Sequence, residues 1–339
     1  MSEIAIIGAG AWGTALSIVL GHKETHRIRL WAHEKEVCDT IAQQRVNEKF
    51  LPGLRIPACV TPCNDLAEAL AEAAIVVSVM PSQHCRRMFE QMRSHLLAET
   101  IIVSATKGLE EISLLRMTEV IVQMIKSGDR LPRISALSGP SFALEAARGD
   151  PTAIAIASQE AELARTVQQE FSHASFRIYT NDDPVGVELG GALKNTVAIA
   201  AGVCSGLGLG HNSVAALITR GLAEMTRLVV ACGGKAETMA GLAGLGDLVL
   251  TCTGGLSRNR SVGVELGRGR KLPEILAGMH GMVAEGIFTT GAAVGLARTH
   301  GVEMPITEQM HAILHEGKAP REAIYELMTR SGKSETLRT

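Results

Sequence analysis

The stretch Ile4-Ala5-Ile6-Ile7-Gly8-Ala9-Gly10-Ala11-Trp12-Gly13-Thr14-Ala15-Leu16 decides the fold of the first half of the chain. It has the pattern of an apolar strand that enters a G-x-G-x-x-G turn and opens a helix. In this pattern the first glycine permits the turn, the second lets a pyrophosphate approach the backbone and the third lets helix and strand pack closely. Free N–H groups at the helix N-terminus then face the anion. The stretch predicts dinucleotide binding at Gly8, Gly10, Ala11, Trp12 and Gly13, rather than a plain glycine turn.

Apolar runs of strand length alternate with amphipathic stretches through the first half of the chain. The strands are expected at Glu3–Ile7, Arg27–Trp31, Ala74–Val79, Thr100–Ala105, Ile134–Leu137, Thr152–Ala157 and Phe176–Tyr179, and the helices at about 11–22, 34–45, 64–72, 82–97, 113–126 and 159–171. Strict alternation calls for right-handed crossovers and a sheet covered on both faces. The expected fold class is therefore α/β, with a Rossmann-type, doubly wound and mainly parallel sheet.

The strand signals stop after Asn181-Asp182-Asp183-Pro184, and Ala/Gly/Leu-rich segments with helical spacing follow to about residue 330. We therefore expect a dinucleotide-binding domain over residues 1–181 and an all-helical substrate and catalytic domain over residues 182–339. The charge-free stretch from Asn195 to Thr219 is long enough to span a bilayer. Because it is broken by several glycines, we expect a buried helix, a glycine loop and a second helix instead.

Composition excludes several classes of protein. The 339 residues carry 33 basic against 35 acidic side chains, 46% hydrophobic residues and only 3% aromatic residues. This length favours two domains at roughly 150 residues each, and the near-neutral charge argues against nucleic acid and membrane surfaces as partners. An acidic start at Met1-Ser2-Glu3 does not resemble a secretory signal, so a cytoplasmic location is expected. Seven scattered cysteines without a C-x-x-C pair favour reduced thiols over disulfides or zinc.

The end of the second expected strand should select the cofactor. NAD-specific folds usually place an acidic residue there, on the ribose 2′-hydroxyl. This chain has Ala32 and His33 instead, followed by Glu34 and Lys35. A histidine beside a lysine does not repel a 2′-phosphate, so NADP is allowed as well as NAD. The alternative is that His33 is a surface residue and Glu34 reaches the ribose.

Two lysines are candidates for the chemistry. Lys107 follows an apolar strand, at the sheet edge where ligands bind in such folds. Lys194 lies in a helical stretch whose neighbours on the same face are all small or apolar. An ammonium there must be paired or partly desolvated, which would lower its pKa toward the range useful for proton transfer.

A third cluster extends from Gly244 to Arg260. Its glycines could form a nest of backbone N–H groups for an anion, and Arg258 offers a planar fork that matches phosphate oxygens. The alternative is a solvent-exposed loop with two basic residues. Cys252 is not favoured as a nucleophile because no partner base can be identified.

Together these segments resemble one family closely. The matching motifs are Gly-Ala-Gly-Ala-Trp-Gly at 8–13, Ala-Thr-Lys-Gly-Leu-Glu at 105–110, Ser-Gly-Pro-Ser-Phe-Ala at 138–143, Gly-Gly-Ala-Leu-Lys-Asn at 190–195, Gly-Leu-Gly-Asp-Leu-Val-Leu-Thr-Cys-Thr at 244–253, Ser-Arg-Asn-Arg at 257–260 and Val283 with Glu285-Gly286. They resemble the bacterial NAD(P)-dependent sn-glycerol-3-phosphate dehydrogenases over nearly the whole chain. The resemblance implies reversible reduction of dihydroxyacetone phosphate to sn-glycerol 3-phosphate by NADH or NADPH, feeding glycerophospholipid synthesis.

The resemblance also implies roles for individual residues. Lys194 would be the proton donor and acceptor, Lys107 would touch substrate and cofactor, and Asp247 would organise the site. The substrate would also contact Gly139, Ser141, Ser257, Arg258 and Asn259, and the cofactor would also contact His33, Ala143, Arg258, Val283 and Glu285. Ala11 stands where the family often has serine, which removes one hydroxyl contact to phosphate. No metal is required, because the two lysines act as the electrophile, and a homodimer is the prior expectation.

Two other functions remain open from the residues. A related two-domain dehydrogenase of the 3-hydroxyacid or 6-phosphogluconate type would share both halves of the fold but require a substrate carboxylate. A non-catalytic NAD(P)-sensing regulator would keep the glycine motif without the lysines and the anion site.

Overall fold

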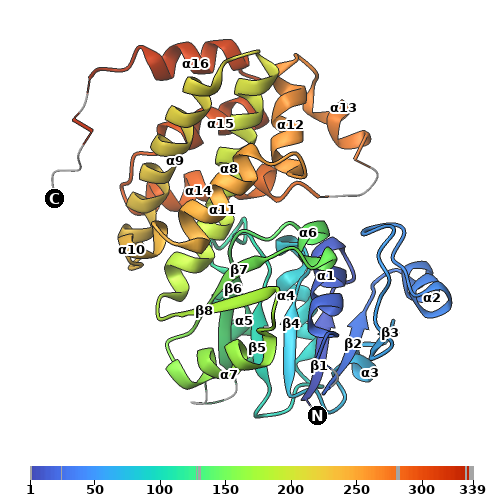
Figure 1. Ribbon diagram of the computed structural model, residues 1–339. Coiled ribbons are helices and arrows are strands. Elements are labelled where there is room, and N and C mark those ends of the chain that lie inside the picture. Colours follow the sequence, from blue (N-terminus) through green and yellow to red (C-terminus); the bar gives the residue numbers. More distant parts are fainter. Residues whose placement is uncertain are drawn as a thin grey trace.

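The computed structural model describes residues 2–23, 25–126, 128, 131–279, 283–332 and 334–335. Figure 1 shows two halves stacked on each other, a sheet with its covering helices below and a group of helices above. Within the described residues the sheet has the order β3-β2-β1-β4-β5-β6-β7-β8. Its strands are β1 (Ser2–Ile7), β2 (His26–Trp31), β3 (Val60–Cys63), β4 (Ile75–Ser78), β5 (Ile101–Ser104), β6 (Arg133–Ser138), β7 (Thr152–Ala157) and β8 (Phe176–Asn181).

The sheet is parallel except at one pair. From β3 to β6 every neighbouring pair is parallel, whereas β7 pairs with β6 in the antiparallel sense and β8 is parallel to β7. The chain runs from β1 through β2 to β3 at one edge, and β4 then pairs with the other side of β1. The switch point, where such sheets bind ligands, therefore lies between β1 and β4. The carboxyl ends of β1, β4 and β5 point toward the helical half (Figure 1).

Helices cover both faces of the sheet. In chain order they are α1 (Ala11–Leu20), α2 (Lys35–Gln44), α3 (Leu66–Leu70), a 3₁₀ turn (Ser82–His84), α4 (Cys85–Met92), α5 (Met117–Ile125), α6 (Ala143–Arg148) and α7 (Ala161–Phe171). Ile4 and Ile6 of β1 pack in one apolar core with Leu16 of α1, while Ala5 and Ile7 pack in another with α3, α4 and α5. A strand buried on both faces needs a continuous apolar run, which explains why β1 does not alternate.

The second half of the described chain is helical. It comprises α8 (Pro184–Gly206), α9 (His211–Ala231), α10 (Ala236–Met239), a π-helical turn (Leu242–Gly246), α11 (Asp247–Thr253), α12 (Arg258–Gly267), α13 (Leu272–Ala277), α14 (Glu285–Thr299), α15 (Pro305–His315) and α16 (Pro320–Met328). α9, α11, α12 and α14 all pack on α8. By length and composition α8 could cross a membrane, but 94% of its apolar window is buried within the protein. It is the central helix of this half.

The fold confirms the expected α/β class and the helical second half, with a few corrections. The edge strand β3 and the short helix α6 were not predicted, and the antiparallel β6–β7 pair departs from the parallel alternation. The expected helix over 82–97 is shorter, ending at Met92. The charge-free stretch forms the rest of α8, a glycine turn and the start of α9, as predicted. All seven cysteines lie in the described part of the chain and are unpaired, five of them buried.

Candidate active site

The glycine turn after β1 has the close contacts that its motif predicts. Gly8 has φ of +124°, and a Cβ there would lie 2.7 Å from the Val79 carbonyl oxygen. A Cβ on Gly13 would lie 1.8 Å from the carbonyl oxygen of Gly8, so any side chain would push α1 off the strand. A Cβ on Gly10 would meet no atom within 4 Å. Gly10 therefore leaves the backbone open to a ligand, while Gly8 and Gly13 serve packing.

The N-terminus of α1 fits a pyrophosphate. Its N-cap residue Gly10 supplies no side-chain cap. The hydrogen bond from Thr14 N to Gly10 O, at 2.9 Å, begins the helical ladder, and the N–H groups of residues 11–13 come before it in the chain. These N–H groups precede the helical ladder and carry the positive end of the helix dipole. The buried Asn47 donates to the carbonyl of Ala9 and to the hydroxyl of Thr14, both at 2.8 Å. Asn47 thus fixes the turn, a role that the sequence did not reveal.

The end of β2 carries no carboxylate at Ala32 or His33. His33 is exposed, and its carbonyl accepts a hydrogen bond from the Asn64 amide at 2.9 Å. Glu34 is half-buried, begins α2 as its N-cap residue, and pairs with Lys49 at 3.3 Å. Both positions follow the carboxyl end of β2, where this type of fold binds the adenosine ribose, so the two predicted alternatives for the ribose contact remain.

Three charged side chains from distant parts of the chain meet at the junction of the two halves. Asp247, the first residue of α11, accepts hydrogen bonds from Lys107 at 2.7 Å and from Lys194 at 2.5 Å, one on each carboxylate oxygen. Lys107 also donates to the carbonyl of Gly139 at 3.2 Å. Lys194 also donates to the hydroxyl of Thr251 at 2.8 Å. We call Lys107, Lys194 and Asp247 the lysine–aspartate trio.

The pKa values of Lys194 and Asp247 are both below their usual values. Burial lowers the pKa of Lys194 to about 8, an effect that Asp247 opposes and Lys107 reinforces. Burial alone would raise the pKa of Asp247, but the two ammonium groups hold it below its usual value. With Asp247 ionised and both lysines protonated the trio carries one net positive charge. Each ammonium has three N–H donors and uses two of them within the protein, so one remains on each lysine.

The loop after β6 lies against the trio. The carbonyl of Gly139 accepts from Lys107, and the hydroxyl of Ser141 donates to the same carbonyl at 3.0 Å. Ala143 is the first residue of α6 and is half-buried. The structure thus places Gly139 and Ser141 beside Lys107, at the carboxyl edge of the sheet.

The start of α12 presents donors for an anion. Ser257 is its buried N-cap residue, and the Ser257 hydroxyl accepts from the N–H of Arg260 at 3.2 Å. The Arg258 side chain is exposed and has no hydrogen-bond or ion-pair partner among the described residues. Desolvation by the protein groups around it lowers the pKa of Arg258, with Glu285 opposing that shift, yet a guanidinium remains cationic. An unpaired cation beside a helix N-terminus suits a phosphate.

Asn259 is occupied within the protein. Its amide donates to Asn195 Oδ1 at 3.0 Å, and its Oδ1 accepts from the N–H of Gly286 at 3.0 Å. The Asn259 side chain therefore joins α8, α12 and α14, and its backbone N–H at the start of α12 is what remains for an anion.

Glu285 begins α14 and joins the two halves of the protein. Its carboxylate accepts from the hydroxyl of Ser82 at 2.8 Å and from the amide of Gln83 at 3.4 Å. Burial raises the pKa of Glu285, against the lowering effect of these donors and Arg258. Val283, two residues earlier, is half-buried. Glu285 lies near enough to Arg258 for the two charges to affect each other's pKa.

One prediction about this region is wrong. Gly244 and Gly246 do not form an anion nest in a loop, because residues 242–253 are helical and the N–H of Gly246 bonds to Gly241 O at 3.1 Å. A Cβ on Gly244 would lie 2.2 Å from the Met239 carbonyl oxygen, so this glycine permits close packing. Thr251, which the sequence did not single out, lies one helical turn after Asp247 and therefore reaches the same ammonium.

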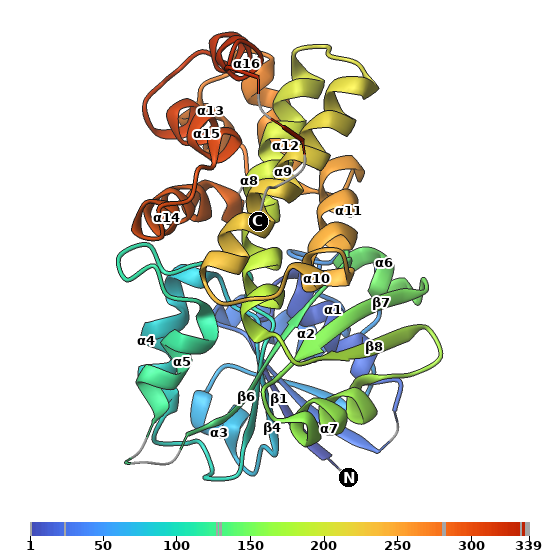
Figure 2. The ribbon, with the colours of Figure 1, turned by 90° about the vertical axis from the view of Figure 1, so that its left-hand side faces the viewer.

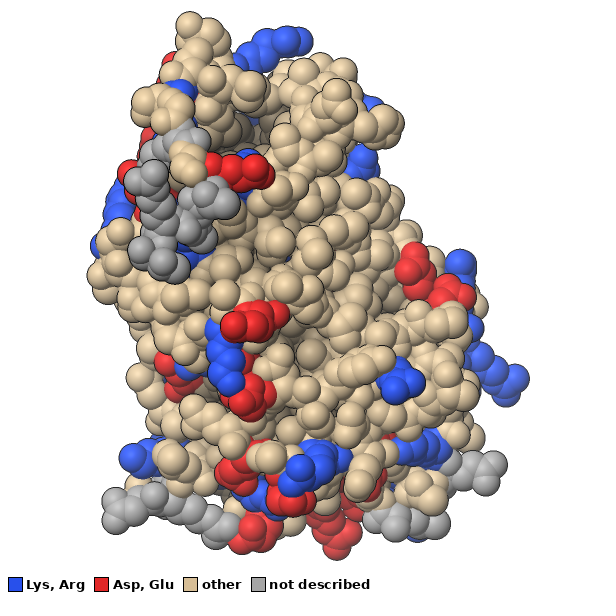
Figure 3. Space-filling model, turned by 60° about the vertical axis from the view of Figure 1, so that its left-hand side comes forward, with Lys and Arg blue, Asp and Glu red and all other residues tan. Residues whose placement is uncertain are grey.

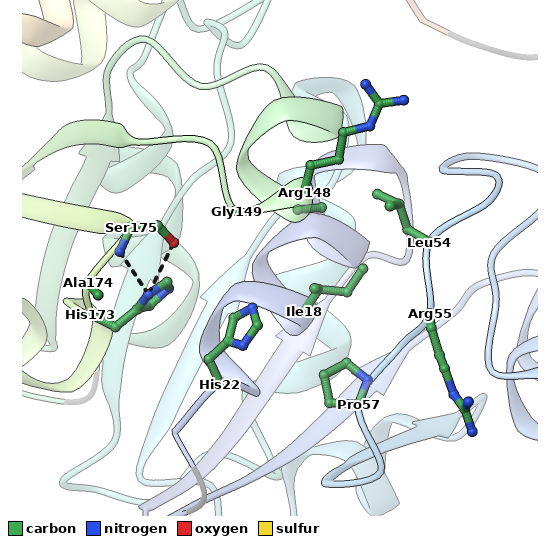
Figure 4. Close-up of a pocket in the computed structure, with 11 residues that line it drawn as sticks. Ile18, His22, Leu54, Arg55, Pro57, Arg148, Gly149, His173, Ala174 and Ser175 are labelled. Atoms are coloured by element: carbon green, nitrogen blue, oxygen red, sulfur yellow. Dashed lines mark hydrogen bonds between the residues drawn. The ribbon is translucent and has the colours of Figure 1, made fainter.

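Two hollows of the molecule are lined by none of the predicted site residues. One of about 660 Å³ is lined by Ile18, His22, Leu54, Arg55, Pro57, Ala147, Arg148, Gly149, His173, Ala174 and Ser175 (Figure 4). It lies near the C-terminal ends of α1 and α6 and contains none of the predicted site residues. Among the described residues no group of three or more His, Cys, Asp or Glu side chains could hold a metal ion.

Two family models match the chain. The model described as NAD-dependent glycerol-3-phosphate dehydrogenase N-terminus matches residues 3–164, and the C-terminus model matches residues 183–325. Together they span both halves of the fold and the whole of the trio.

Individual proteins give the same result. A glycerol-3-phosphate dehydrogenase [NAD(P)+] of Koribacter versatilis is 66% identical over 99% of both chains. That of Acidobacterium capsulatum is 55% identical over 99% of this chain and 100% of its own. The crystal structure of glycerol-3-phosphate dehydrogenase from Coxiella burnetii superposes with a TM-score of 0.91 at 41% identity, covering 97% of this chain and 99% of the other.

Proposed function

The chain belongs to the NAD-dependent glycerol-3-phosphate dehydrogenase family, and we propose how its own residues carry out the reaction. The enzyme interconverts dihydroxyacetone phosphate and sn-glycerol 3-phosphate with NAD or NADP. The bound nicotinamide supplies or accepts the hydride. Gly8, Gly10, Ala11, Trp12 and Gly13 hold its pyrophosphate. His33, Lys107, Ala143, Arg258, Val283 and Glu285 complete the cofactor contacts.

The proton comes from Lys194. In the direction of reduction, negative charge grows on the carbonyl oxygen as the carbonyl carbon is reduced, and the free N–H of Lys194 donates its proton to that oxygen. The ammonium of Lys107 stabilises the same charge. Lys194 is left neutral and regains a proton from water, and in the direction of oxidation it acts as the base. Asp247 touches both ammonium groups and keeps them close despite their mutual repulsion.

The substrate phosphate is held at the start of α12. The Arg258 guanidinium and the N–H groups that follow Ser257, including that of Asn259, supply the donors, while Gly139 and Ser141 border the reacting end. Binding energy from this remote phosphate orients the carbonyl toward Lys194. The family models and the named relatives favour this reaction over the 3-hydroxyacid and 6-phosphogluconate alternative.

The observation that carries the proposal is the buried Asp247 bridging two lysines that lie 53 and 140 residues away in the chain. The experiment is oxidation of NADH and NADPH, followed at 340 nm, with dihydroxyacetone phosphate as substrate. Rapid oxidation with this substrate and little with unphosphorylated dihydroxyacetone or with oxoacids is expected. Preference for an oxoacid would contradict the proposal, and cofactor binding without turnover would favour the regulatory alternative.

We also assign the domain bounds, the metabolic role, the location and the oligomeric state. We assign residues 1–181 to the dinucleotide-binding domain and residues 182–339 to the catalytic domain. The product is the backbone of glycerophospholipids, which supports a role in phospholipid synthesis. A near-neutral composition and the burial of α8 support a cytoplasmic enzyme without membrane insertion, and we expect it to act as a homodimer.

A further inference from the structure

Glu188 is a buried carboxylate that the proposed reaction does not use. It lies in α8, six residues before Lys194, and is 9% exposed. Figure 2 shows the start of α8 reaching the sheet half. There the Glu188 carboxylate accepts hydrogen bonds from Arg116 Nη1 at 2.6 Å, from Thr118 N at 2.8 Å and from Thr118 Oγ1 at 2.5 Å. Glu188 therefore joins α8 to the start of α5.

The Arg116–Glu188 ion pair differs from the surface ion pairs of the protein by its burial. Figure 3 shows Lys and Arg side chains beside Asp and Glu along the lower edge of the sheet half. Exposed pairs of this kind contribute little to stability, because water replaces either partner. The side chains of Arg116 and Glu188 are only 16% and 6% exposed. Removing one partner would leave the other charge poorly solvated and without compensation, so the pair fixes Arg116 firmly relative to α8.

The chain between β5 and α5 carries Lys107 and ends at Arg116. We call residues 105–116 the Lys107 segment. Leu109 and Arg116 form an antiparallel β-bridge, and the N–H of Glu110 donates to the carbonyl of Leu115 at 3.0 Å. The backbone of Arg116 is thus paired with the backbone two residues after Lys107. A displacement of Arg116 would therefore also displace Lys107.

Two side-chain hydrogen bonds join the Lys107 segment, all of whose residues are described, to the helical half. One runs from Lys107 to Asp247 at 2.7 Å, and the other from Arg116 to Glu188 at 2.6 Å. Leu109, which is 2% exposed, packs in one apolar core with residues of α8. The helix α8 therefore holds the segment both by charge and by apolar packing.

Other contacts hold the Lys107 segment to the sheet half. Glu110 accepts from Arg86 at 2.8 and 2.6 Å, and the hydroxyl of Thr106 donates to the carbonyl of Ser78 at 3.2 Å. These contacts place the segment on its own half. They do not set its distance from Lys194, because that lysine lies in α8 of the other half.

We propose that Glu188 is a positioning residue for Lys107, acting through Arg116. The helix α8 then sets both catalytic lysines, because it carries Lys194 and holds Lys107 in place. Glu188 contributes no chemistry of its own, since both of its oxygens accept hydrogen bonds from the start of α5. The inference rests on the proposed function, in which Lys107 stabilises charge on the carbonyl oxygen and Lys194 donates the proton.

The titration of Lys194 reports where Lys107 lies. The charged or titratable groups that affect Lys194 are Lys107 and, from α11, Asp247 and Cys252. The Lys107 ammonium lowers the pKa of Lys194, whereas Asp247 raises it. If Lys107 moved away, the pKa of Lys194 would rise from about 8, and the decline of reduction at high pH would move to higher pH. A carboxylate that merely stabilises the fold would leave this decline in place.

The test uses Glu188→Gln and Arg116→Met in the full chain, with oxidation of NADPH by dihydroxyacetone phosphate followed from about pH 6 to 10. Each variant should lower kcat at least about 10-fold, because the displaced ammonium of Lys107 no longer stabilises the developing charge. The KM for dihydroxyacetone phosphate should change by under about 3-fold, since the phosphate contacts at the start of α12 remain. The decline should move to higher pH in both variants. The double variant should lose no more kcat than the worse single variant, because both changes break one contact.

The matched control is Glu224→Gln. Glu224 of α9 is 3% exposed, and its carboxylate accepts from Ile306 N at 2.8 Å and from Thr307 N at 3.2 Å at the start of α15. It is a second buried carboxylate at a helix start, but neither α9 nor α15 carries a residue of the trio. Glu224→Gln should lower the urea midpoint, while kcat and the pH profile stay as in the wild type. Arg116→Met keeps the test valid if Glu188→Gln fails to fold, as judged by circular dichroism.

Wild-type turnover separates this inference from the proposed function. An inactive wild type would overturn both. With an active wild type, the inference alone is overturned if folded Glu188→Gln and Arg116→Met keep kcat and the pH profile, or if Glu224→Gln changes them equally. A decline that moves to lower pH would also contradict the inference, because Lys194 would then have lost the influence of Asp247 rather than that of Lys107.

Discussion

The nucleotide turn and the lysine–aspartate trio both receive negative charge, but they are built in opposite ways. The turn uses uncharged backbone N–H groups from one continuous stretch, Gly8 to Gly13, and its constraint is space, since a Cβ on Gly13 would lie 1.8 Å from a carbonyl oxygen. The trio uses a half-buried lysine from the loop after β5, a buried lysine from α8 and a buried aspartate from α11. We infer that the turn should be sensitive to added volume and insensitive to pH, and the trio the reverse.

The largest effect should come from removing the proton donor. Lys194→Ala should lower turnover by at least about 100-fold, as loss of a general acid does. Affinity for the cofactor should stay nearly unchanged, because the turn does not depend on the trio. Stopped-flow turnover and a fluorescence titration with NADPH measure the two quantities. Near-normal turnover in a folded variant would remove Lys194 from the mechanism.

The next effect separates a phosphate anchor from a solvated side chain. Arg258→Met keeps much of the stem and deletes the charged fork, whose contact with phosphate is worth roughly 1.5–3 kcal/mol, or about 10- to 150-fold. The kcat/KM for dihydroxyacetone phosphate should fall by that factor, while the poor activity on unphosphorylated dihydroxyacetone should hardly change. Equal losses on both substrates would indicate a role toward the cofactor alone. No loss on either would leave Arg258 as a surface residue.

A matched pair of glycine substitutions tests the constraint on the turn. Gly13→Ala must move backbone and should lower the free energy of unfolding by about 1–3 kcal/mol, as overpacking does. Gly10→Ala has free space around its Cβ and should cost under about 1 kcal/mol in stability, while both should weaken cofactor binding. Urea unfolding without cofactor measures the stability of each variant. Equal stabilities would mean that α1 does not pack on Gly8 as described.

The smallest effect concerns the ribose. His33→Asp places a negative charge near a 2′-phosphate at an exposed position, so the NADPH/NADH ratio of kcat/KM should fall by about 2- to 5-fold. The control is Glu34→Gln, which should leave NADH use intact unless Glu34 holds the ribose. An unchanged ratio in His33→Asp, or complete refusal of NADPH by the wild type, would contradict this interpretation.

The comparison also explains what could be predicted from the sequence. The turn is local, so its residues, its strand and its helix follow from one motif. The strand β3 was missed because it has four residues with Pro62 among them, which is tolerated because β3 lies at the edge of the sheet. The antiparallel β6–β7 pair depends on a short connection through α6. This helix has only six residues and a weak helical pattern in the sequence.

The trio could be predicted only in part. Lys194 was identifiable because an ammonium stood on an apolar helix face. Asp247 entered through the family resemblance, since nothing in its own segment shows that a carboxylate will meet two lysines from other elements. Gly244 and Gly246 predict a loop because glycine costs about 1 kcal/mol in a helix, but close packing at Gly244 outweighs that cost in the structure. Thr251 had no local signal, because its role depends on where α8 places Lys194.

The pH dependence of kcat/KM for dihydroxyacetone phosphate reduction tests the central claim most directly. Lys194 must be protonated to act as the acid, so activity should be full below its pKa of about 8 and fall as pH rises through it. Asp247 raises the pKa of Lys194, so Asp247→Asn should move this decline to lower pH and reduce its plateau. A decline near the ordinary lysine value of about 10.4, or one that Asp247→Asn leaves in place, would contradict the account.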